Sequence, residues 1–176
     1  MKPTSDIMSI IQKRRSVRAF YPDPIPPEHV ESMMEALRWA PSAGNRQPWH
    51  FFFVFNSEMK KALAAAAFNQ EFVSQAPLAV VVCALPGKSE ARYGKRGRDL
   101  YVYQDTAAAV ENLLLLATSL DYGSCWVGAF DENRAKQALQ LPEEMRPVAI
   151  IPIGKAAEAP PPPSRLRRAE IITVVK

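Results

Sequence analysis

The residues with the most evident chemistry form the run Arg14-Arg15-Ser16-Val17-Arg18, which places three guanidinium groups and a hydroxyl within five positions. Guanidinium groups donate paired hydrogen bonds to phosphate or carboxylate and keep their charge at any working pH. Taken alone, the run is equally compatible with a solvated basic surface. A second polar stretch, from Pro41 to Trp49, lies between two apolar segments and contains serine, asparagine, arginine and glutamine. Together the two stretches predict two walls of one site for an anionic ligand.

Other side chains offer little chemistry of their own. The only histidines, His29 and His50, fall in unrelated segments and lack a second ligand at the spacing that zinc requires. No serine stands in a nucleophile elbow, and the sequence has neither a dinucleotide-binding glycine motif nor a phosphate-binding loop. We therefore expect no metal site and no hydrolase triad. If the chain is an enzyme, a bound cofactor is expected to supply the reactivity.

The composition indicates one globular domain. The chain has 176 residues, of which 48% are hydrophobic and 23% charged, with a net charge of +4. Its basic residues cluster at Arg14–Arg18 and Arg165–Arg168, which suits a phosphate-bearing cofactor but also nucleic acid or a membrane surface. Cys83 and Cys125 lie in separate apolar runs and are expected to be buried thiols in a reducing compartment. Because no stretch fits a signal peptide or a membrane span, we expect a cytoplasmic protein.

The elements that must position these residues follow from the spacing of the apolar side chains. Helical and strand-like segments alternate, which predicts a mixed α and β protein with helices packed on both faces of one sheet. Residues 86–98, with three glycines and five basic side chains, are expected to form an exposed and mobile loop. Helices are expected at 6–13 (capped by Ser5 or Asp6), 27–39, after 57, at 100–122 and at 131–139, and strands at 49–55, 78–85, 124–130 and 148–153.

Several of these segments carry a specific burial prediction. The strand at 49–55 is almost wholly apolar and is expected to be covered on both faces. The helix at 100–122 is apolar over more than one face, which suits the centre of the molecule or a contact between two subunits. The proline-rich tail ends in a β-like run, Ile171 to Val175, and is expected to lie along a surface, including that of another subunit. Buried helix positions are expected at Val30, Met33, Met34 and Leu37, at Met59, Leu63 and Ala66, and at Thr106, Ala109, Val110, Leu113, Leu114, Ala117 and Leu120.

Three motifs resemble one known family in their order and spacing. They are Arg14-Arg15-Ser16-Val17-Arg18-Ala19-Phe20, Ala40-Pro41-Ser42-Ala43-Gly44-Asn45-Arg46-Gln47-Pro48-Trp49 and Cys125-Trp126-Val127-Gly128-Ala129-Phe130. The chain resembles the short form of the FMN-dependent nitroreductase family over nearly its whole length. The resemblance implies an α+β fold, a three-layer α/β/α sandwich with a central mixed, mostly antiparallel sheet. It also implies an FMN-binding domain at 1–155 and an arm at 156–176 that packs on the partner of a homodimer.

The resemblance further implies which residues surround FMN, and it assigns no catalytic residue of the protein. Val127 stands where some branches of the family carry Glu, so their detailed substrate preference is not carried over. The implied FMN contacts are Arg14, Arg15, Ser16 and Arg18 at the phosphate, ribityl chain and pyrimidine edge; Pro41, Ser42, Ala43, Asn45 and Gln47 at the isoalloxazine from the other subunit; Asn69, or Gln70 in its place, at the polar edge; Trp126, Val127 and Gly128 beside the ring; and Arg165 and Arg167, or Arg168, at the phosphate from the arm.

The activity implied by the resemblance is electron transfer from NAD(P)H through FMN to a small electrophile such as a nitroaromatic or a quinone. A specialised branch of the family, with flavin-fragmenting or dehalogenating activity, is an alternative enzyme. A non-catalytic FMN-binding protein or a nucleic-acid-binding module would also use arginines at phosphates. The absorption spectrum of the purified protein distinguishes flavin from nucleic acid. The sequence alone identifies neither the physiological acceptor nor the choice between NADH and NADPH.

Overall fold

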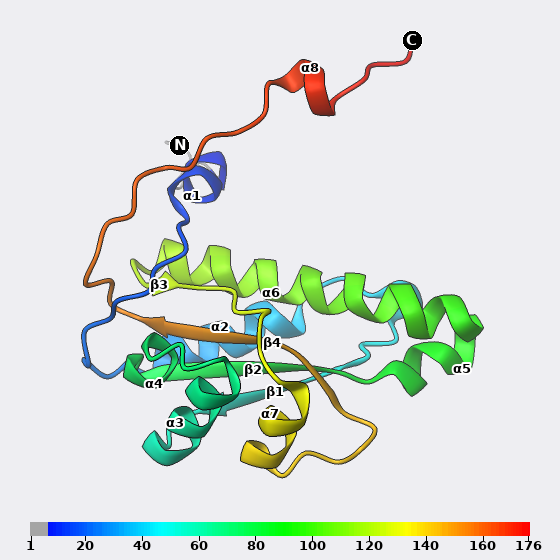
Figure 1. Ribbon diagram of the computed structural model, residues 1–176. Helices are drawn as coiled ribbons and strands as arrows, with labels where there is room; N and C mark the ends of the chain where they lie inside the picture. The colour runs from blue at the N-terminus through cyan, green and yellow to red at the C-terminus, as the bar shows by residue number, and fades with distance from the viewer. Residues whose placement is uncertain (1–6) are drawn as a thin grey trace.

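The computed structural model describes residues 7–176, so the expected helix cap at Ser5 or Asp6 lies outside the described residues. A four-stranded sheet forms the centre, in the order β1 (Trp49–Val54), β2 (Leu78–Ala84), β4 (Arg146–Gly154) and β3 (Gly123–Ser124), and all three neighbouring pairs are antiparallel (Figure 1). A parallel bridge joins Ser16 to Ser124 beside β3. The sheet is therefore mixed and mostly antiparallel, as the sequence motifs implied.

Helices cover both faces of this sheet, which makes three layers (Figure 1). Alternate residues of β2 enter the two cores because strand side chains point to opposite faces. Val80 and Val82 join the core that includes residues of α2 and α6, whereas Val81 and Cys83 join the core that includes residues of α3 and α7. The helices are α2 (Pro27–Arg38) and α6 (Val102–Ser119) on one face, and α3 (Ser57–Ala66), α4 (Phe72–Gln75) and α7 (Glu132–Leu139) on the other.

The central helix α6 packs along α2 and the sheet. Leu113 and Ala117 are fully buried within it, and the Asn112 side chain donates a hydrogen bond to the Ala36 carbonyl of α2 at 3.1 Å. A short π-helix (Gly97–Tyr101) leads into α6. The expected apolar helix is confirmed, although Leu120, expected to be buried, is only half-buried just beyond its end. The helix therefore fixes the distance between the residues that pack at its two ends.

The prediction of an exposed loop at 86–98 is wrong, because most of this segment is the helix α5 (Pro86–Arg96). Proline suits the first turn of a helix, where its missing N–H costs no hydrogen bond. The buried Ser89 lies directly against the backbone of Gly97, where a Cβ atom would overlap with the Ser89 carbonyl. Gly94 adopts φ 55° and kinks the helix. Gly97 thus allows close packing and Gly94 allows the kink, and these roles replace the mobility that was expected of the segment.

Other predictions are wrong, right only in part, or not tested by a single chain. The expected strand at 124–130 is paired only at Gly123–Ser124 and through a single bridge from Val127 to Ile150. The first strand, β1, is covered only in part: Phe51 and Phe53 pack on one core and Phe52 on the other, but His50 is exposed. Met34 and Met59 are exposed rather than buried. The β-like terminal run is not paired within this chain, where Ile171 ends the short helix α8 (Arg168–Ile171), and its expected place along another subunit stays a prediction.

Two segments stand off the body of the molecule, α1 (Ile7–Lys13) and the arm from about residue 161 onward (Figure 1). Ile7 in α1 is 67% exposed, and Val174 near the C-terminus is 75% exposed. Isolated apolar side chains on a surface are ordinary, but two whole segments with no buried residue are not stabilised by this chain's core. A second polypeptide surface would bury them.

Replacement of Leu113 by alanine should lower the free energy of unfolding by about 2–5 kcal/mol, because it leaves a cavity in a fully packed core. Denaturant titration of the full chain at fixed protein concentration measures this loss. Replacement of the exposed Met59 by alanine is the matched control and should change stability by less than about 0.5 kcal/mol. Equal losses in the two variants would contradict the burial pattern.

Candidate functional site

The arginine motif crosses the end of the sheet with its backbone fixed. The Val17 N–H donates to the Ser124 carbonyl at 2.9 Å, next to the parallel bridge between Ser16 and Ser124. The Val17 side chain is buried against Gly123, where an added Cβ atom would lie 2.9 Å from it. Only a glycine at 123 permits this contact. The apolar residue at the centre of the motif therefore anchors the polar residues on either side.

The first residues of the C-terminal arm, which we call the arm root, pair with the same motif. Phe20 and Ala156 form an antiparallel bridge, and the Tyr21 N–H donates to the Lys155 carbonyl at 2.9 Å. The Glu158 side chain accepts a hydrogen bond from the Arg18 N–H. Glu158 was not among the residues predicted for the site, and an isolated acid in a proline-rich segment gave no signal for its role. These contacts hold the start of the arm beside the arginines.

A cavity of about 260 Å³ lies between the motif and the arm. No carboxylate lines it, so four guanidinium groups surround a space without an internal counter-charge. A phosphate dianion needs several such fixed donors, and the residues therefore fit the phosphate group that the sequence implied. The cavity is lined by Arg14, Arg15, Ser16, Arg18, Pro160, Pro161, Pro163 and Arg165.

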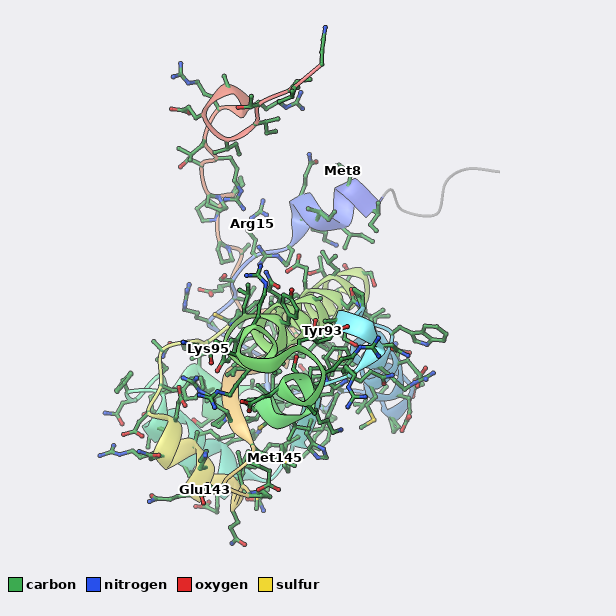
Figure 2. All side chains as sticks on the ribbon, turned by 90° about the vertical axis from the view of Figure 1, so that its right-hand side faces the viewer. Met8, Arg15, Tyr93, Lys95, Glu143 and Met145 are labelled. Carbon is green, nitrogen blue, oxygen red and sulfur yellow. The ribbon has the colours of Figure 1, made fainter. Side chains whose placement is uncertain are left out.

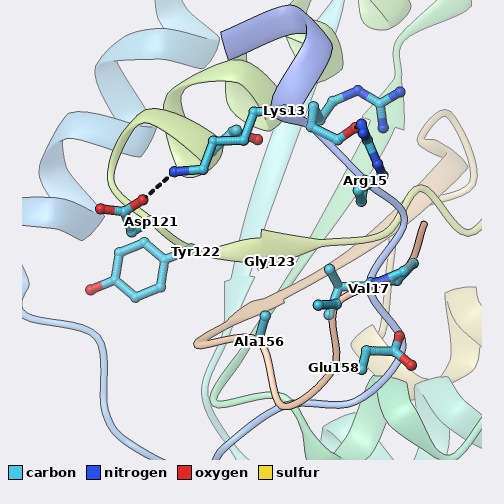
Figure 3. A pocket seen from close by; sticks show the side chains of 12 residues that line it. Lys13, Arg15, Val17, Asp121, Tyr122, Gly123, Ala156 and Glu158 are labelled. Atoms are coloured by element: carbon cyan, nitrogen blue, oxygen red, sulfur yellow. Dashed lines mark hydrogen bonds and ion pairs between the residues drawn. The ribbon is translucent and has the colours of Figure 1, made fainter. Parts of the chain in front are cut away.

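A second cavity, of about 340 Å³, is shown in Figure 3 and shares Arg14, Arg15 and Pro160 with the first. Lys13 and Asp121 form an ion pair of 2.6 Å at its rim, and Tyr122 and Glu158 also line it. The Arg15 guanidinium donates to the Gln12 carbonyl, so part of its hydrogen-bonding capacity already serves the end of α1. The two cavities together extend the basic site towards the C-terminal end of α6.

The third motif lies against the first through Cys125. Burial raises the pKa of the Cys125 thiol, and the nearby cations of Arg18 and Arg14 oppose that rise. The thiol is thus a neutral, packed group that also hydrogen-bonds with the Ser16 side chain, as expected from its apolar surroundings. Val127 is buried beyond it, whereas Trp126 is 42% exposed. The indole of Trp126 is therefore partly accessible to a ligand, although it does not line either basic cavity.

The loop before α4 reaches the same region. The Gln70 side-chain amide donates to the Ala67 carbonyl at 2.9 Å and to the Ala129 carbonyl at 3.2 Å, which ties this loop to the third motif. Asn69 is exposed and has φ 61°, and the preceding Phe68 has φ 57°. With the amide of Gln70 occupied by backbone carbonyls, Asn69 is the residue of the two with its side chain available.

The loop from Pro41 to Gln47 carries unusual backbone geometry. Gly44, Asn45 and Gln47 all have positive φ, at 54°, 53° and 49°. Non-glycine residues rarely adopt this conformation, and such residues gather at functional sites when the surrounding structure holds them there. Here the Ser42 hydroxyl accepts from the Gln47 N–H at 3.0 Å, and the Gln47 amide donates to Asn45 at 3.1 Å.

Asp105 of α6 holds this loop from behind, and its role was not predicted. One carboxylate oxygen accepts from the Ala43 N–H at 3.0 Å, and the other is buried without a hydrogen-bond partner in the described part of the chain. Burial raises the pKa of Asp105, and the hydrogen bond from Ala43 lowers it by less. The sequence signal for this role is that Asp105 is a single acidic residue on the buried side of an apolar helix.

One chain does not bring all the expected residues together. The Pro41 loop lies at the N-terminal end of α6 with Asp105, whereas the arginine motif lies at the C-terminal end near Thr118. At 1.5 Å per residue, Asp105 and Thr118 stand about 20 Å apart. Arg167 is also outside the cavity, because its guanidinium pairs with Glu170 at 3.4 Å. The structure therefore brings together the arginine motif, the arm root, the third motif and Gln70. It does not place the Pro41 loop with them.

The described residues give no sign of two other kinds of site. Across residues 7–176, no group of three or more His, Cys, Asp or Glu side chains is placed to hold a metal ion. No helix in that range is long and apolar enough to cross a membrane.

The protein is an α+β sandwich with an arginine-lined cavity at one end of its sheet. The nitroreductase family model matches residues 11–81 and 57–155. A candidate NADH dehydrogenase/NAD(P)H nitroreductase of Archaeoglobus fulgidus is 36% identical over 153 residues, which cover 85% of this chain and 84% of that protein. The chain belongs to the nitroreductase family.

Solved structures agree with this assignment. A nitroreductase family protein from Clostridium novyi NT superposes with a TM-score of 0.81 at 32% identity, covering 87% of this chain and 86% of that chain. The NADPH:FMN oxidoreductase from Vibrio harveyi, complexed with NAD+, has the same fold, with a TM-score of 0.87 at 23% identity over 97% of this chain and 77% of that chain. The expected nitroreductase-like sandwich is confirmed.

Replacement of Asp105 by asparagine should change how stability depends on pH. Because the pKa of Asp105 is raised on folding, the unfolded chain binds fewer protons between the ordinary and the raised value, and wild-type stability falls as pH rises through that window. Asparagine keeps the acceptor for Ala43 but cannot ionise. The difference in melting temperature, Asp105→Asn minus wild type, should therefore become more positive as pH rises from 4 to 7. Parallel melting curves across this range would contradict the assignment.

Proposed function

We propose that this chain is an NAD(P)H-dependent oxidoreductase that binds FMN and delivers electrons to a small electrophile such as a nitroaromatic or a quinone. The observation that carries the proposal is the cavity lined by Arg14, Ser16, Arg18 and Arg165 without any carboxylate. The name of the Archaeoglobus fulgidus relative supports NAD(P)H as the donor. When bound, FMN supplies the redox chemistry, and the protein supplies binding, orientation and electrostatics.

The residues of the cavity have distinct roles in this proposal. The guanidinium groups of Arg14 and Arg165 hold the phosphate, while Arg15 and Ser16 add donors near it. Arg18 and Asn69 reach the polar edges of the isoalloxazine, and the segment around Val127 lies beside the ring. The fixed backbone of the motif supports these roles, because pre-positioned donors lose little entropy when the ligand binds. Trp126 and Gly128 complete the apolar side.

A second copy of the chain completes the site in this proposal. The Pro41, Ser42, Ala43, Asn45 and Gln47 loop is held about 20 Å from the arginine motif by α6, so it would serve the partner's FMN rather than its own. The exposed apolar residues of α1 and of the arm support a homodimer, since a partner would bury them. Arg167 and the arm would then reach the partner. Two unpaired, buried cysteines support a cytoplasmic, reducing setting.

Combined replacement of Arg14 and Arg18 by alanine should sharply reduce FMN occupancy. Each lost charge-assisted contact is expected to weaken binding by about 1.5–3 kcal/mol. Flavin absorbance per protein chain after gel filtration measures occupancy. Arg134→Ala, at an exposed arginine of α7, is the matched control and should retain FMN. Full occupancy in the double variant would refute the assigned phosphate site.

Truncation after Ala159 should weaken both the dimer and FMN binding, because it removes Arg165 and the apolar end of the arm. Sedimentation with detection at protein and flavin wavelengths measures the two properties on each species. The full-length chain, as a dimer with bound FMN, is the reference. A full-length monomer with stoichiometric FMN would contradict the shared site, and a truncated dimer with undiminished FMN would contradict only the role of the arm.

A further inference from the structure

The helix α5 packs directly on the Pro41 loop. A Cβ atom on Gly44 would overlap with the Tyr93 hydroxyl and would lie 3.2 Å from Nε of Arg92. The Arg46 guanidinium donates to the Lys88 carbonyl at 3.4 Å. Figure 2 shows this end of the molecule, with Tyr93 and Lys95 on the segment that faces the viewer. A ligand that approaches the exposed side of the Pro41 loop therefore also contacts α5.

This end of the molecule carries cations without counter-ions. The two acids of the segment, Glu90 and Asp99, are both paired with Arg98, at 3.5 Å and 3.3 Å. Within residues 7–176, five other basic side chains here form no ion pair, and we call them the cationic patch. Its members are Arg46, Lys88, Arg92, Lys95 and Arg96.

Two tyrosines order the arginines of the cationic patch. The rings of Tyr93 and Tyr101 meet edge to face with centroids 5.3 Å apart. The Arg92 guanidinium lies 5.6 Å from the Tyr93 ring, and that of Arg96 lies 5.3 Å from the Tyr101 ring. Arg96 also donates from Nε to the Tyr101 hydroxyl at 2.9 Å, which leaves its terminal nitrogens available. A guanidinium stacked on an aromatic ring is pre-organised to bind phosphate.

We propose that the cationic patch binds the 2′-phosphate of NADPH, so that this chain takes electrons from NADPH in preference to NADH. This inference rests on the proposed function, which places the Pro41 loop beside FMN. In Rossmann-type sites a carboxylate binds the ribose hydroxyls of NADH, whereas an arginine accommodates the 2′-phosphate of NADPH, and the same preference of charge applies to this surface. Here both acids of the segment are occupied by Arg98, and Arg92 and Arg96 are not paired.

Position and charge both favour this ligand. The electron donor must reach the exposed face of the flavin, and the cationic patch borders the loop proposed to lie there. The 2′-phosphate adds nearly two negative charges that NADH lacks. A cavity of about 350 Å³ lies beside the loop, lined by Ser42, Tyr101 and Asp105, and its Tyr101 is the ring that Arg96 contacts.

Steady-state kinetics of the FMN-loaded full chain test the proposal. Wild type should show a higher kcat/KM with NADPH than with NADH. The Arg92→Ala, Arg96→Ala double variant should lose roughly tenfold or more with NADPH and stay within about twofold with NADH. Arg134→Ala, at an exposed arginine of α7 that is not part of the cationic patch, is the matched control and should preserve the ratio between the two donors.

Binding without turnover provides an independent readout. Calorimetric titration of the FMN-loaded chain should show that adenosine 2′,5′-bisphosphate binds more tightly than adenosine 5′-monophosphate. The double variant should bind the two probes equally. The preference of the wild type should also decrease with added salt, since exposed charges are screened.

The outcomes separate this inference from the proposed function. Equal or better use of NADH by the wild type overturns the inference alone, as does an equal loss with both donors in the double variant. Flavin that dithionite reduces but neither NADH nor NADPH reduces would overturn the proposed function and the inference with it. Equal binding of the two adenosine probes by the wild type would overturn the inference even if turnover is normal.

Discussion

The helix α6 imposes the constraint on which the rest of this structure depends. One side of it is buried from Val102 to Thr118, so the distance between its two ends cannot change without unfolding the core. The Pro41 loop is hydrogen-bonded to Asp105 at one end, and the arginine motif lies near Thr118 at the other. A ligand that needs both therefore needs two chains. The homodimer that we propose follows from this rigid spacing and from the apolar segments that one chain leaves exposed.

Apolar contacts and backbone hydrogen bonds fix the backbone of the site, which leaves the polar side chains available. Val17 is buried against Gly123, and its N–H is satisfied by Ser124, so the arginines on either side need not hold the chain in place. Glu158 connects the arm root to the same backbone. Glu158 lines the neighbouring cavity and not the one between the motif and the arm, so four guanidinium groups line the latter with no carboxylate among them.

Backbone strain marks the same surfaces. Of the six non-glycine residues with positive φ in the described chain, Asn45, Gln47, Phe68 and Asn69 lie in the two loops expected to face FMN. Such conformations persist only where surrounding contacts hold them. Asp105 and the α5 helix provide those contacts for the first loop, which links the buried carboxylate, the loop and the cationic patch in one unit.

The sequence by itself determined the class of fold and the family to which the chain belongs. The uninterrupted apolar run of β2, the Asp131 cap of α7 and the arginines of the first motif are local signals, carried by residues close together in the chain. Only the tertiary structure decided that residues 86–96 are helical, because Gly97 packs on Ser89 and the segment on Gly44. It also decided that Asp105 holds Ala43 and that Gln70 binds Ala129. Contacts between distant residues leave no periodic pattern in the sequence, since each depends on where the whole core places its partner.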